Sequence, residues 1–374
     1  MNQENKKQKS DVYFSTFRAV VGDSLLDKLK RLIVKAGIDK IDFKNKFTAI
    51  KIHFGEPGNL AFIRPNFARV VVDLIKEKGG KSFLTDCNTL YVGGRKNALD
   101  HIDAAYQNGF SPFSTNAHVI IADGLKGTDE SIVEVKDGLY VKQAKIGRAV
   151  MDADIVISLN HFKGHELTGF GGAIKNIGMG CGSRAGKMEM HSAGKPSVDQ
   201  SLCIGCGACI RICAHSAPKI VNKKSFIDKN KCVGCGRCIG VCPVDAIEGA
   251  GDESNEILNY KMAEYAAAVV RGRPSFHITL AMDISPCCDC HGENDIPIVA
   301  DIGMFASFDP VAIDQACVDA VNKQPVLAGS CLAEKTHHCQ DRFTDTHPTT
   351  DWKGQIEHAQ KLGLGTKEYN LIEI

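Results

Sequence analysis

The sequence lacks any long apolar run. No segment approaches the roughly 18 consecutive apolar residues that a helix needs to cross a bilayer. The opening residues, MNQENKKQKS, are polar and have no apolar core of the kind found in secretory signals. We therefore expect no membrane span and no export, and we predict a cytoplasmic protein.

Net charge is also nearly absent, because 45 Lys and Arg offset 44 Asp and Glu to leave +1. Nothing in this balance predicts a nucleic-acid partner, which a basic surface would favour. Apolar residues make up 44% and charged residues 24%, as in an ordinary globular protein. A length of 374 residues predicts one large α/β domain with a small insertion, or two domains.

Cysteine is abundant, with 16 residues. Such a count fits either a secreted disulfide framework or metal and redox chemistry. A chain without an export signal stays in a reducing compartment, where disulfides are rare. Spacing also favours metal and redox chemistry, since eight of the cysteines fall into two compact runs.

These two runs form an internal repeat. The segment that begins at Cys203 recurs 29 residues later at Cys232, and all four cysteines of each run keep their register. A matching apolar–Asp pair introduces each run, Val198-Asp199 and Ile227-Asp228. The repeat resembles a bacterial two-cluster ferredoxin, and it predicts electron transfer in a reducing, anoxic cytoplasm.

In the ferredoxin spacing, three close thiolates hold one 4Fe-4S cluster and the fourth cysteine of each run ligates the other cluster. The resemblance therefore implies one cluster on Cys203, Cys206, Cys209 and Cys242, and a second on Cys232, Cys235, Cys238 and Cys213. Glycines between the cysteines suit a tightly wrapped loop. A pair of zinc sites is the alternative, but zinc sites commonly use two separated C-x-x-C pairs. Ala214 stands where the ferredoxins usually have proline, which affects only a local turn.

Short β-branched runs alternate with helical patterns in the remaining chain, which predicts β-α-β units and a mostly parallel sheet with flanking helices. We expect strands at 48–53, 82–86, 119–123, 155–160, 277–283 and 296–307. We expect helices through Leu25 to Ile33 and at 67–78, 255–270 and 310–321. Asp309 is the expected N-cap of the last helix, with proline in its first turn.

Nearly every expected strand ends in polar side chains. His53, Asp86, Asn88, Asp123, Asn160, His161 and Asp283 all stand at or just after a strand end. Open α/β sheets bind ligands outside the carboxyl ends of their strands, which favours a cleft lined by these residues. The alternative is that strands simply end at the surface, where polar residues are common.

A glycine-rich loop follows the strand at 155–160 and carries His161, Lys163, His165, Lys175 and Asn176. A helix that starts after the last of its glycines would offer free N–H groups to an anion. The histidines could transfer protons, and Arg95, in another polar loop, could bind a carboxylate or phosphate in bidentate fashion. We predict His161, Lys163 and His165 as catalytic residues, and as substrate-binding residues His53, Asp86, Asn88, Arg95, Lys175 and Asn176. A purely structural glycine-rich loop is the alternative.

Cys287, Cys288 and Cys290 follow the strand at 277–283 and form a candidate third metal or redox site. Their spacing matches no complete cluster motif, so further ligands such as Cys181 or His291 would be needed. Unligated thiols are the alternative. Other cysteines are less informative: Cys331, His337, His338 and Cys339 are a weaker metal candidate, Cys317 is expected to be buried, and Cys87 is unassigned.

Several stretches together are similar to the domain-of-unknown-function family 362, whose members often carry an inserted ferredoxin module. These are residues 160–165, 171–176, 288–290, 301–314 and 362–369. The resemblance implies that Cys288 and Cys290 belong to a recurring element, but it implies little about function.

The sequence thus predicts an α/β domain at 11–196 and 251–374, interrupted at 197–250 by a ferredoxin-like domain with two 4Fe-4S clusters. Electrons would pass through the clusters to the cleft, in an oxidoreductase that acts on a small anionic substrate. Two alternatives stay open: an electron carrier without catalysis, and an assembly or reductive-activation factor for a client enzyme. Each of them requires a redox partner protein.

Overall fold

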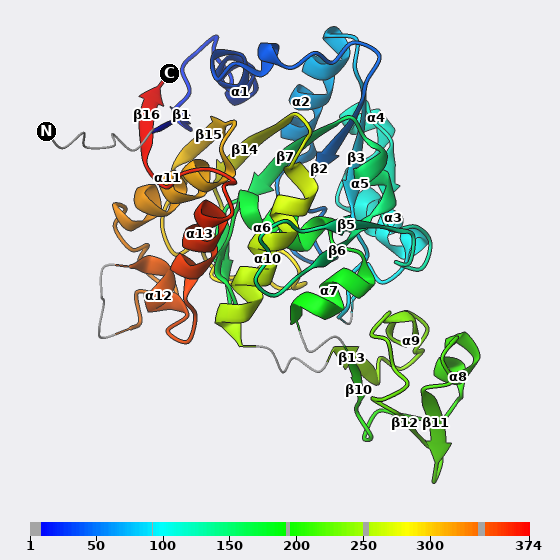
Figure 1. Ribbon diagram of the computed structural model, residues 1–374. Helices are drawn as coiled ribbons and strands as arrows, with labels where there is room; N and C mark the ends of the chain where they lie inside the picture. Colours follow the sequence, from blue (N-terminus) through cyan, green and yellow to red (C-terminus); the bar gives the residue numbers. More distant parts are fainter. Residues whose placement is uncertain (1–8, 92, 192–194, 250–253, 336–340) are drawn as a thin grey trace, which may run out of the picture.

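A computed structural model describes residues 9–91, 93–191, 195–249, 254–335 and 341–374 (Figure 1). Its centre is an eight-stranded sheet in which only β15 runs against its neighbours. In spatial order the strands are β16 (Tyr369–Glu373), β1 (Ser10–Thr16), β15 (Gly303–Ser307), β14 (Ser275–Ala281), β7 (Ile155–His161), β2 (Phe47–Lys51), β3 (Lys81–Asp86) and β4 (Val119–Ile121). The predicted mostly parallel α/β fold is confirmed.

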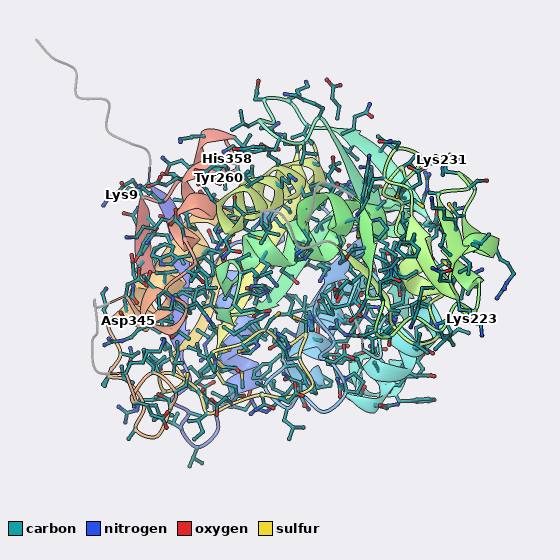
Figure 2. The ribbon with its side chains drawn as sticks, turned by 90° about the horizontal axis from the view of Figure 1, so that it is seen from below. Lys9, Lys223, Lys231, Tyr260, Asp345 and His358 are labelled. Atoms are coloured by element: carbon teal, nitrogen blue, oxygen red, sulfur yellow. The ribbon has the colours of Figure 1, made fainter. Side chains whose placement is uncertain are left out.

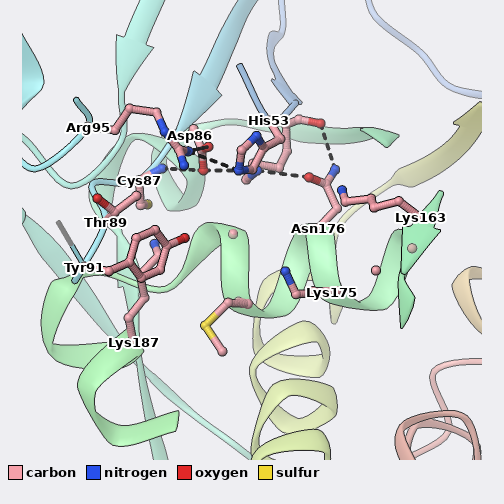
Figure 3. Close-up of a pocket in the computed structure, with 15 residues that line it drawn as sticks. His53, Asp86, Cys87, Thr89, Tyr91, Arg95, Lys163, Lys175, Asn176 and Lys187 are labelled. Carbon is pink, nitrogen blue, oxygen red and sulfur yellow. Dashed lines mark hydrogen bonds and ion pairs between the residues drawn. The ribbon is translucent and has the colours of Figure 1, made fainter. Parts of the chain in front are cut away.

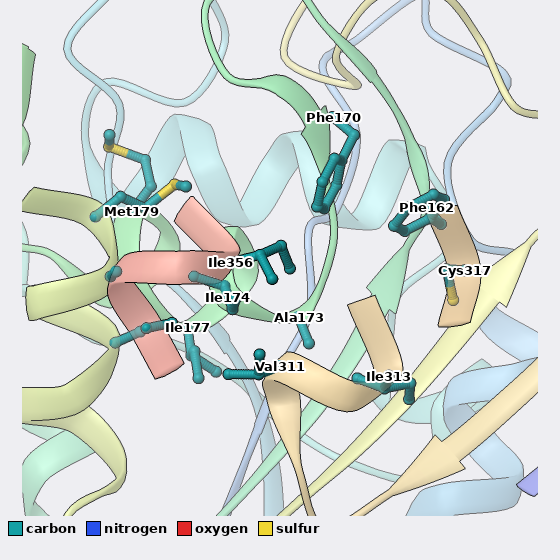
Figure 4. Close-up of a cluster of buried hydrophobic side chains, with 14 of the residues drawn as sticks. Phe162, Phe170, Ala173, Ile174, Ile177, Met179, Val311, Ile313, Cys317 and Ile356 are labelled. Carbon is teal, nitrogen blue, oxygen red and sulfur yellow. The ribbon is translucent and has the colours of Figure 1, made fainter. Parts of the chain in front are cut away.

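The central strands are buried on both faces, as in other parallel sheets. Every residue of β7 is buried, and its apolar side chains alternate between two hydrophobic clusters. The helices α1 (Leu25–Lys35) and α2 (Pro65–Glu77) contribute to one cluster. The other cluster, shown in Figure 4, includes side chains of α6 (Ala173–Cys181), α10 (Asn255–Val270), α11 (Pro310–Asn322) and α13 (Trp352–Lys361).

Helix α10 packs against both α6 and α13. Tyr260 of α10 stacks on His358 of α13 with ring centroids 4.7 Å apart, and Figure 2 labels both residues. The ring of His358 also lies 2.9 Å from a carboxylate oxygen of Glu264, which is fully buried in α10. Nearly all of α10 is buried, so this helix fixes the position of α6 beneath the sheet edge.

The shorter elements occupy the connections. The helices are α3 (Ala98–Gln107), α4 (Pro112–Thr115), α5 (Arg148–Asp152), α7 (Arg184–His191), α12 (Arg342–Thr346) and a 3-10 turn at Ile38–Lys40. The strands form two hairpins, β5 (Glu130–Glu134) with β6 (Gln143–Gly147) and β8 (Lys163–His165) with β9 (Gly169–Gly171). Among the described residues, no helix is long and apolar enough to cross a membrane.

Residues 195–249 contain a separate group of small elements, called the small segment below. They are β10 (Pro196–Val198), α8 (Ala208–Ile212), β11 (Pro218–Val221), β12 (Lys224–Ile227), α9 (Arg237–Gly240) and β13 (Ile247–Gly249). Strand β10 pairs with β13, so the two ends of the small segment lie side by side. Figure 1 shows the small segment projecting from the body of the molecule beyond α7.

The predicted elements agree with the structure, but several strands are shorter than predicted, and the ranges 48–53 and 119–123 end at Lys51 and Ile121. The range 296–307 is a strand only from Gly303, because Pro297 has no N–H to donate and Val299 forms just an isolated bridge. The strand predicted at 277–283 ends at Ala281, since Asp283 turns away with a φ of 45°. Asp309 caps α11 as expected, accepting from the N–H groups of Val311 and Ala312.

The burial of His277 in β14 predicts that the free energy of unfolding depends on pH. This histidine is fully buried, and neither ring nitrogen has a hydrogen-bond partner in the part of the chain that the structure describes. Burial lowers its pKa from 6.5 to about 3, so below pH 6.5 the unfolded chain binds the extra proton and stability falls. We expect the free energy of unfolding of His277→Leu, relative to that of the wild type, to rise by roughly 2 kcal/mol when the pH falls from 7 to 5. Urea unfolding at both pH values measures this, and an unchanged difference would contradict it.

Candidate functional site

A cavity of about 470 Å³ lies at the carboxyl edge of the sheet, between the ends of β2 and β3 and helix α6 (Figure 3). We call it the inner cavity. Its charged lining consists of five cations and one carboxylate: Lys51, Arg95, Lys163, Lys175, Lys187 and Asp86. This excess of positive charge in a largely buried space favours an anionic ligand.

Arg95 supplies the guanidinium group that lines the inner cavity, and its exposed fraction is 1%. Its Nε lies 2.7 Å from a carboxylate oxygen of Glu56, and its Nη1 lies 3.1 Å from His53 Nε2. Its Nη2 has no hydrogen-bond partner among the described residues. Because a buried donor without a partner is costly, Arg95 is suited to bind an anion in the cavity.

His53 lines the same cavity, next to Arg95. Burial lowers its pKa well below the usual value, and the charge of Arg95 acts in the same direction. His53 Nδ1 accepts from the N–H of Gly55 at 3.0 Å and its Nε2 lies 3.1 Å from Arg95, so both ring nitrogens already have protein partners.

Lys51 is a lining residue that sequence reasoning missed, as is Lys187. The amine of Lys51 lies 3.1 Å from Asp86 and 3.0 Å from Asn176 Oδ1. Burial acts to raise the pKa of Asp86, but Lys51 and other cations outweigh it and hold the pKa below its usual value. A lysine at the end of the short, otherwise uncharged strand Phe47–Lys51 is the signal that could have identified this residue.

Asn88 does not line the inner cavity. Its side-chain amide donates to Asp123 at 2.8 Å and to the carbonyl of Gly124 at 2.9 Å, which ties the loop after β3 to the loop after β4. We therefore correct the predicted substrate contact of Asn88 to an anchoring role.

His161 is buried, and both of its ring nitrogens are engaged. Its Nδ1 lies 2.9 Å from Asp289, and its Nε2 lies 2.7 Å from the carbonyl of Met282. Lys163 also pairs with Asp289, at 3.1 Å. Asp289 separates Cys288 from Cys290, so His161 and Lys163 anchor the loop that carries these thiols. Both ring nitrogens of His161 therefore have protein partners, and its predicted role as acid or base stays a prediction.

The N-terminus of α6 is occupied by a side chain of the protein itself. Asp314 of α11 accepts from the N–H groups of Ala173 at 2.6 Å and Ile174 at 2.9 Å. The helix begins after Gly172 as predicted, but its N–H groups are not free to bind a substrate anion. The expected anion site at this helix end is therefore wrong, because an internal carboxylate fills it.

The structure brings His165, Cys288 and Cys290 together, with their ligand atoms within 4.8 Å of one another, so this group could hold a metal ion. Glu166, Cys290 and His291 form a second such group. Cys287 belongs to neither group, and Cys181 lies beside Cys87, whose thiol is 3.3 Å from the Cys181 carbonyl. His165 therefore joins Cys288 and Cys290 in a candidate metal group, and the predicted role of Cys287 as a metal ligand stays a prediction. Among the less informative residues, Cys317 is buried as expected, and His337, His338 and Cys339 lie outside the described residues.

Positive charge surrounds Cys288. The amine of Lys175 lies 3.5 Å from its sulfur. A side-chain hydrogen bond with Cys290 lowers the pKa of Cys288 well below its usual value, and Lys175 and His165 lower it further against the effect of burial. The same hydrogen bond raises the pKa of Cys290. These shifts favour the thiolate at Cys288 and the thiol at Cys290.

A second cavity, of about 1060 Å³, adjoins the first, and we call it the outer cavity. The two cavities share four lining residues, Tyr91, Lys175, Met179 and Lys187. His165 and Cys290 line the outer cavity from the α/β body. Asp245, Ile247 and Glu248 line it from the small segment. The outer cavity thus lies between the repeat of cysteines and the Cys288–Cys290 loop.

The repeated cysteines form two groups in the small segment. A cavity of about 300 Å³ is lined by Cys203, Cys206, Cys209 and Cys242, and one of about 340 Å³ by Cys213, Cys232, Cys235 and Cys238. The fourth cysteine of each run therefore lies with the first three of the other run, which is the crossed arrangement of two-cluster ferredoxins.

The loops around these cysteines fit cluster binding. Gly205, Gly207, Gly234 and Gly236 all have φ between 67° and 72°, a left-handed conformation that glycine adopts without strain. Backbone N–H groups donate to Cys203 at 3.2 Å and to Cys242 at 3.3 Å. Among the described residues, none of the groups close enough for a single ion includes a cysteine of the repeat.

Comparisons with known proteins place these observations in context. A family model described as "Domain of unknown function (DUF362)" matches residues 48–319. A thylakoid-associated protein of Synechocystis sp. is 28% identical over 131 residues, which are 33% of this chain and 35% of that protein. The chain thus spans about a third of the length of this curated relative.

Two solved structures resemble the chain weakly. The lactate racemase apoprotein of Thermoanaerobacterium thermosaccharolyticum has 12% identity and a TM-score of 0.39, over 76% of this chain and 53% of that one. A protein of Thermotoga maritima has 13% identity and a TM-score of 0.37, over 70% of this chain and 52% of that one.

Proposed function

The chain belongs to the family described as Domain of unknown function (DUF362), and because that description assigns no activity, we propose the function from the site itself. We propose an iron–sulfur redox protein that passes electrons to a small anionic substrate bound in the inner and outer cavities. Residues 197–250 would be an inserted ferredoxin-like domain, and residues 11–196 and 251–374 the α/β domain that binds the substrate.

Two 4Fe-4S clusters would be held by the two groups of four cysteines, and each would store and release one electron. The crossed grouping of the cysteines, the left-handed glycines and the N–H groups directed at the sulfurs support this assignment. The chain's own contribution is to hold the thiolates in place and to stabilise negative charge on sulfur with backbone donors.

The single observation that carries the proposal is the position of the outer cavity. Ile247 and Glu248, which follow the fourth cysteine of the second run, form one wall, while His165 and Cys290 form another. A ligand in this cavity would contact both the cluster-binding segment and the thiol loop. Such a position between a redox module and polar side chains is what a substrate-reducing site requires.

The charges suggest how a substrate would be oriented. Arg95 has an unused donor, and Lys51 and Lys187 add positive charge to the inner cavity, so an anionic group would bind there. Lys175 lines both cavities and could donate a proton to a group that gains electrons. His165 could act in the same way from the outer cavity, whereas His161 positions the thiol loop.

One observation favours the electron-carrier alternative. Cys206 is exposed, so a partner protein could approach the first cluster directly. Residues 197–249 carry seven Lys and Arg against four Asp and Glu, and Figure 2 labels Lys223 and Lys231 in this segment. An acidic redox protein would be the partner in either case, as electron donor to an oxidoreductase or as either donor or acceptor for a carrier.

The proposal is tested by the reoxidation of chemically reduced protein. Under anoxic conditions, a series of small carboxylates and phosphate esters is mixed with dithionite-reduced protein, and the visible absorbance of the clusters is followed. We expect at least one anion to accelerate reoxidation, and Lys175→Met to slow this reaction by roughly 10-fold or more, since a charge-assisted hydrogen bond contributes about 1.5–3 kcal/mol.

Arg69→Met is the matched control, because Arg69 lies on the exposed surface of α2 and its ion pair with Asp73 is solvated. It should reoxidise as fast as the wild type, and an artificial dye acceptor should oxidise all three proteins equally. Reoxidation by dye or protein acceptors alone, with no response to any anion, would favour the carrier instead.

A further inference from the structure

Cys288 and Cys290 are arranged as a pair of thiols that face each other. Their sulfur atoms lie within 4.8 Å, and a side-chain hydrogen bond joins them. One residue separates them, and that residue, Asp289, is held by His161 at 2.9 Å and Lys163 at 3.1 Å. The backbone between the thiols is therefore fixed, while Cys290 lines the outer cavity.

His165 is held as a hydrogen-bond donor to this pair. Its Nδ1 accepts from the backbone N–H groups of Leu167 and Thr168, both at 3.1 Å. A neutral imidazole whose Nδ1 accepts hydrogen bonds carries its proton on Nε2. A metal bound through Nε2 would need a lone pair there, with Nδ1–H donating to a second group, as metal-binding histidines usually do. The backbone around His165 therefore opposes metal binding.

Lys175 points to the same conclusion. Its amine lies 3.5 Å from the sulfur of Cys288, within reach as a donor. A cation in this position would repel a metal ion that approaches the same sulfur, but it stabilises a free thiolate. Cys288 thus receives hydrogen bonds from Lys175, His165 and Cys290, and its surroundings already satisfy a sulfur anion.

We propose that Cys288 and Cys290 are a catalytic dithiol that reduces small anionic disulfides, with Cys290, which lines the outer cavity, as the attacking thiol and the buried Cys288 as its base and resolving thiol. This inference rests on the proposed function for the binding of the anion, since the carboxylate of such a substrate would bind among the cations of the inner cavity. The outer cavity, which Cys290 lines, has room for the rest of the molecule.

The reaction balances as two successive exchanges. Cys290 gives its proton to Cys288 and attacks one sulfur of the substrate, which breaks the S–S bond, expels the other sulfur as a thiolate and leaves a mixed disulfide. Cys288 gives that proton to the leaving thiolate and attacks the sulfur of Cys290, which releases the second half of the substrate as a thiolate. The substrate gains two electrons and the protein holds a Cys288–Cys290 disulfide. The Cys288–Cys290 disulfide returns to the dithiol when it gains two electrons and two protons. The two clusters proposed for residues 197–250 would each supply one of these electrons.

The test measures the thiols directly, on anaerobically purified protein with its iron content known. The protein reacts with dithiodiglycolate, an anionic disulfide, and its remaining thiols are then blocked with iodoacetamide and mapped by mass spectrometry. We expect Cys288 and Cys290 to lose both labels and the mass of two hydrogen atoms, while Cys287 stays labelled. The neutral hydroxyethyl disulfide should react at least roughly 10-fold more slowly, because it lacks the charge-assisted contacts.

Variants separate the roles of the two thiols. Cys288→Ser should trap one substrate half on Cys290, Cys290→Ser should not react, and Cys287→Ser should behave as the wild type. Full labelling of both thiols in the wild type would overturn the proposal without any variant. So would a bound metal other than cluster iron that is lost in the Cys288→Ser, Cys290→Ser double variant.

The two proposals can fail independently. A protein that contains both clusters but forms no disulfide retains the proposed redox function and loses the dithiol. A protein that forms the disulfide but contains no iron and no sulfide loses the clusters and retains the dithiol chemistry. Iron and sulfide are measured on the same samples as the thiols, so each result is assigned to one proposal.

Discussion

Cys242→Ser is expected to disturb the cluster held by Cys203, Cys206 and Cys209, although Cys242 belongs to the second run of the repeat. The structure groups Cys242 with these three thiols in one cavity and Cys213 with the other three. We therefore expect Cys242→Ser to have the spectrum and the iron content of Cys203→Ser. Each variant should lose or alter one cluster, which is about four of about eight irons.

Cys213→Ser provides the matched control, since it should resemble Cys232→Ser instead. Electron paramagnetic resonance of the reduced proteins distinguishes the pairs by the spectrum of the remaining cluster, since Cys242→Ser and Cys203→Ser would retain one cluster and Cys213→Ser and Cys232→Ser the other. If Cys242→Ser instead resembled Cys232→Ser, each run would bind its own cluster and the crossed assignment would be wrong.

Arg95→Met is expected to weaken anion binding by roughly 10- to 100-fold, which corresponds to the 1.5–3 kcal/mol of a hydrogen bond to a charged group. The reason is the free Nη2 donor in a cavity where water is largely excluded. Calorimetric titration with inorganic phosphate and with acetate measures the effect. Unchanged affinity for both anions would contradict an anion site at Arg95.

Arg95→Met should also destabilise the fold, because it leaves the Glu56 carboxylate buried without its partner at 2.7 Å. The Arg95→Met, Glu56→Gln double variant removes that unpaired charge and should recover part of the stability, but none of the anion affinity. This separation distinguishes a binding role for Arg95 from a purely structural one.

The sheet and its polar edge could be predicted from the sequence because they depend on local patterns. Each central strand is a short apolar run, and parallel strands bring their carboxyl ends to the same edge. His53 and Asp86 therefore lie in the inner cavity as that pattern indicates. The strand predicted at 296–307 is too long, because its first residues are apolar and pack on the core without pairing to another strand. Such a segment has the same composition as a strand.

The roles of individual side chains depend on contacts between distant parts of the chain. Asp314 fills the N-terminus of α6 from a helix that begins more than 130 residues later, a contact that no local pattern encodes. Asp289 likewise engages His161 across the sheet edge. A polar residue at a strand end can line a cavity or anchor a loop, and only the packing of the whole fold separates Asp86 from Asn88.

The grouping of the repeated cysteines could be predicted from their spacing alone, because cluster ligation constrains where the ligands stand in the sequence. Each run fixes three ligands within a few residues, and the repeat supplies the fourth from the other half. Cys288 and Cys290 have no such self-contained pattern. Their surroundings come from Lys175 on α6 and from His165 on β8, so the distinction between a metal site and a dithiol required the structure.

The most direct test of the account is a measurement of iron, acid-labile sulfide and zinc per chain in protein purified without oxygen. The account predicts about eight irons and about eight sulfides, with little zinc. About two zinc ions with no sulfide would show that the repeated cysteines bind single ions. That result would contradict the proposed electron transfer, whatever the cavities bind.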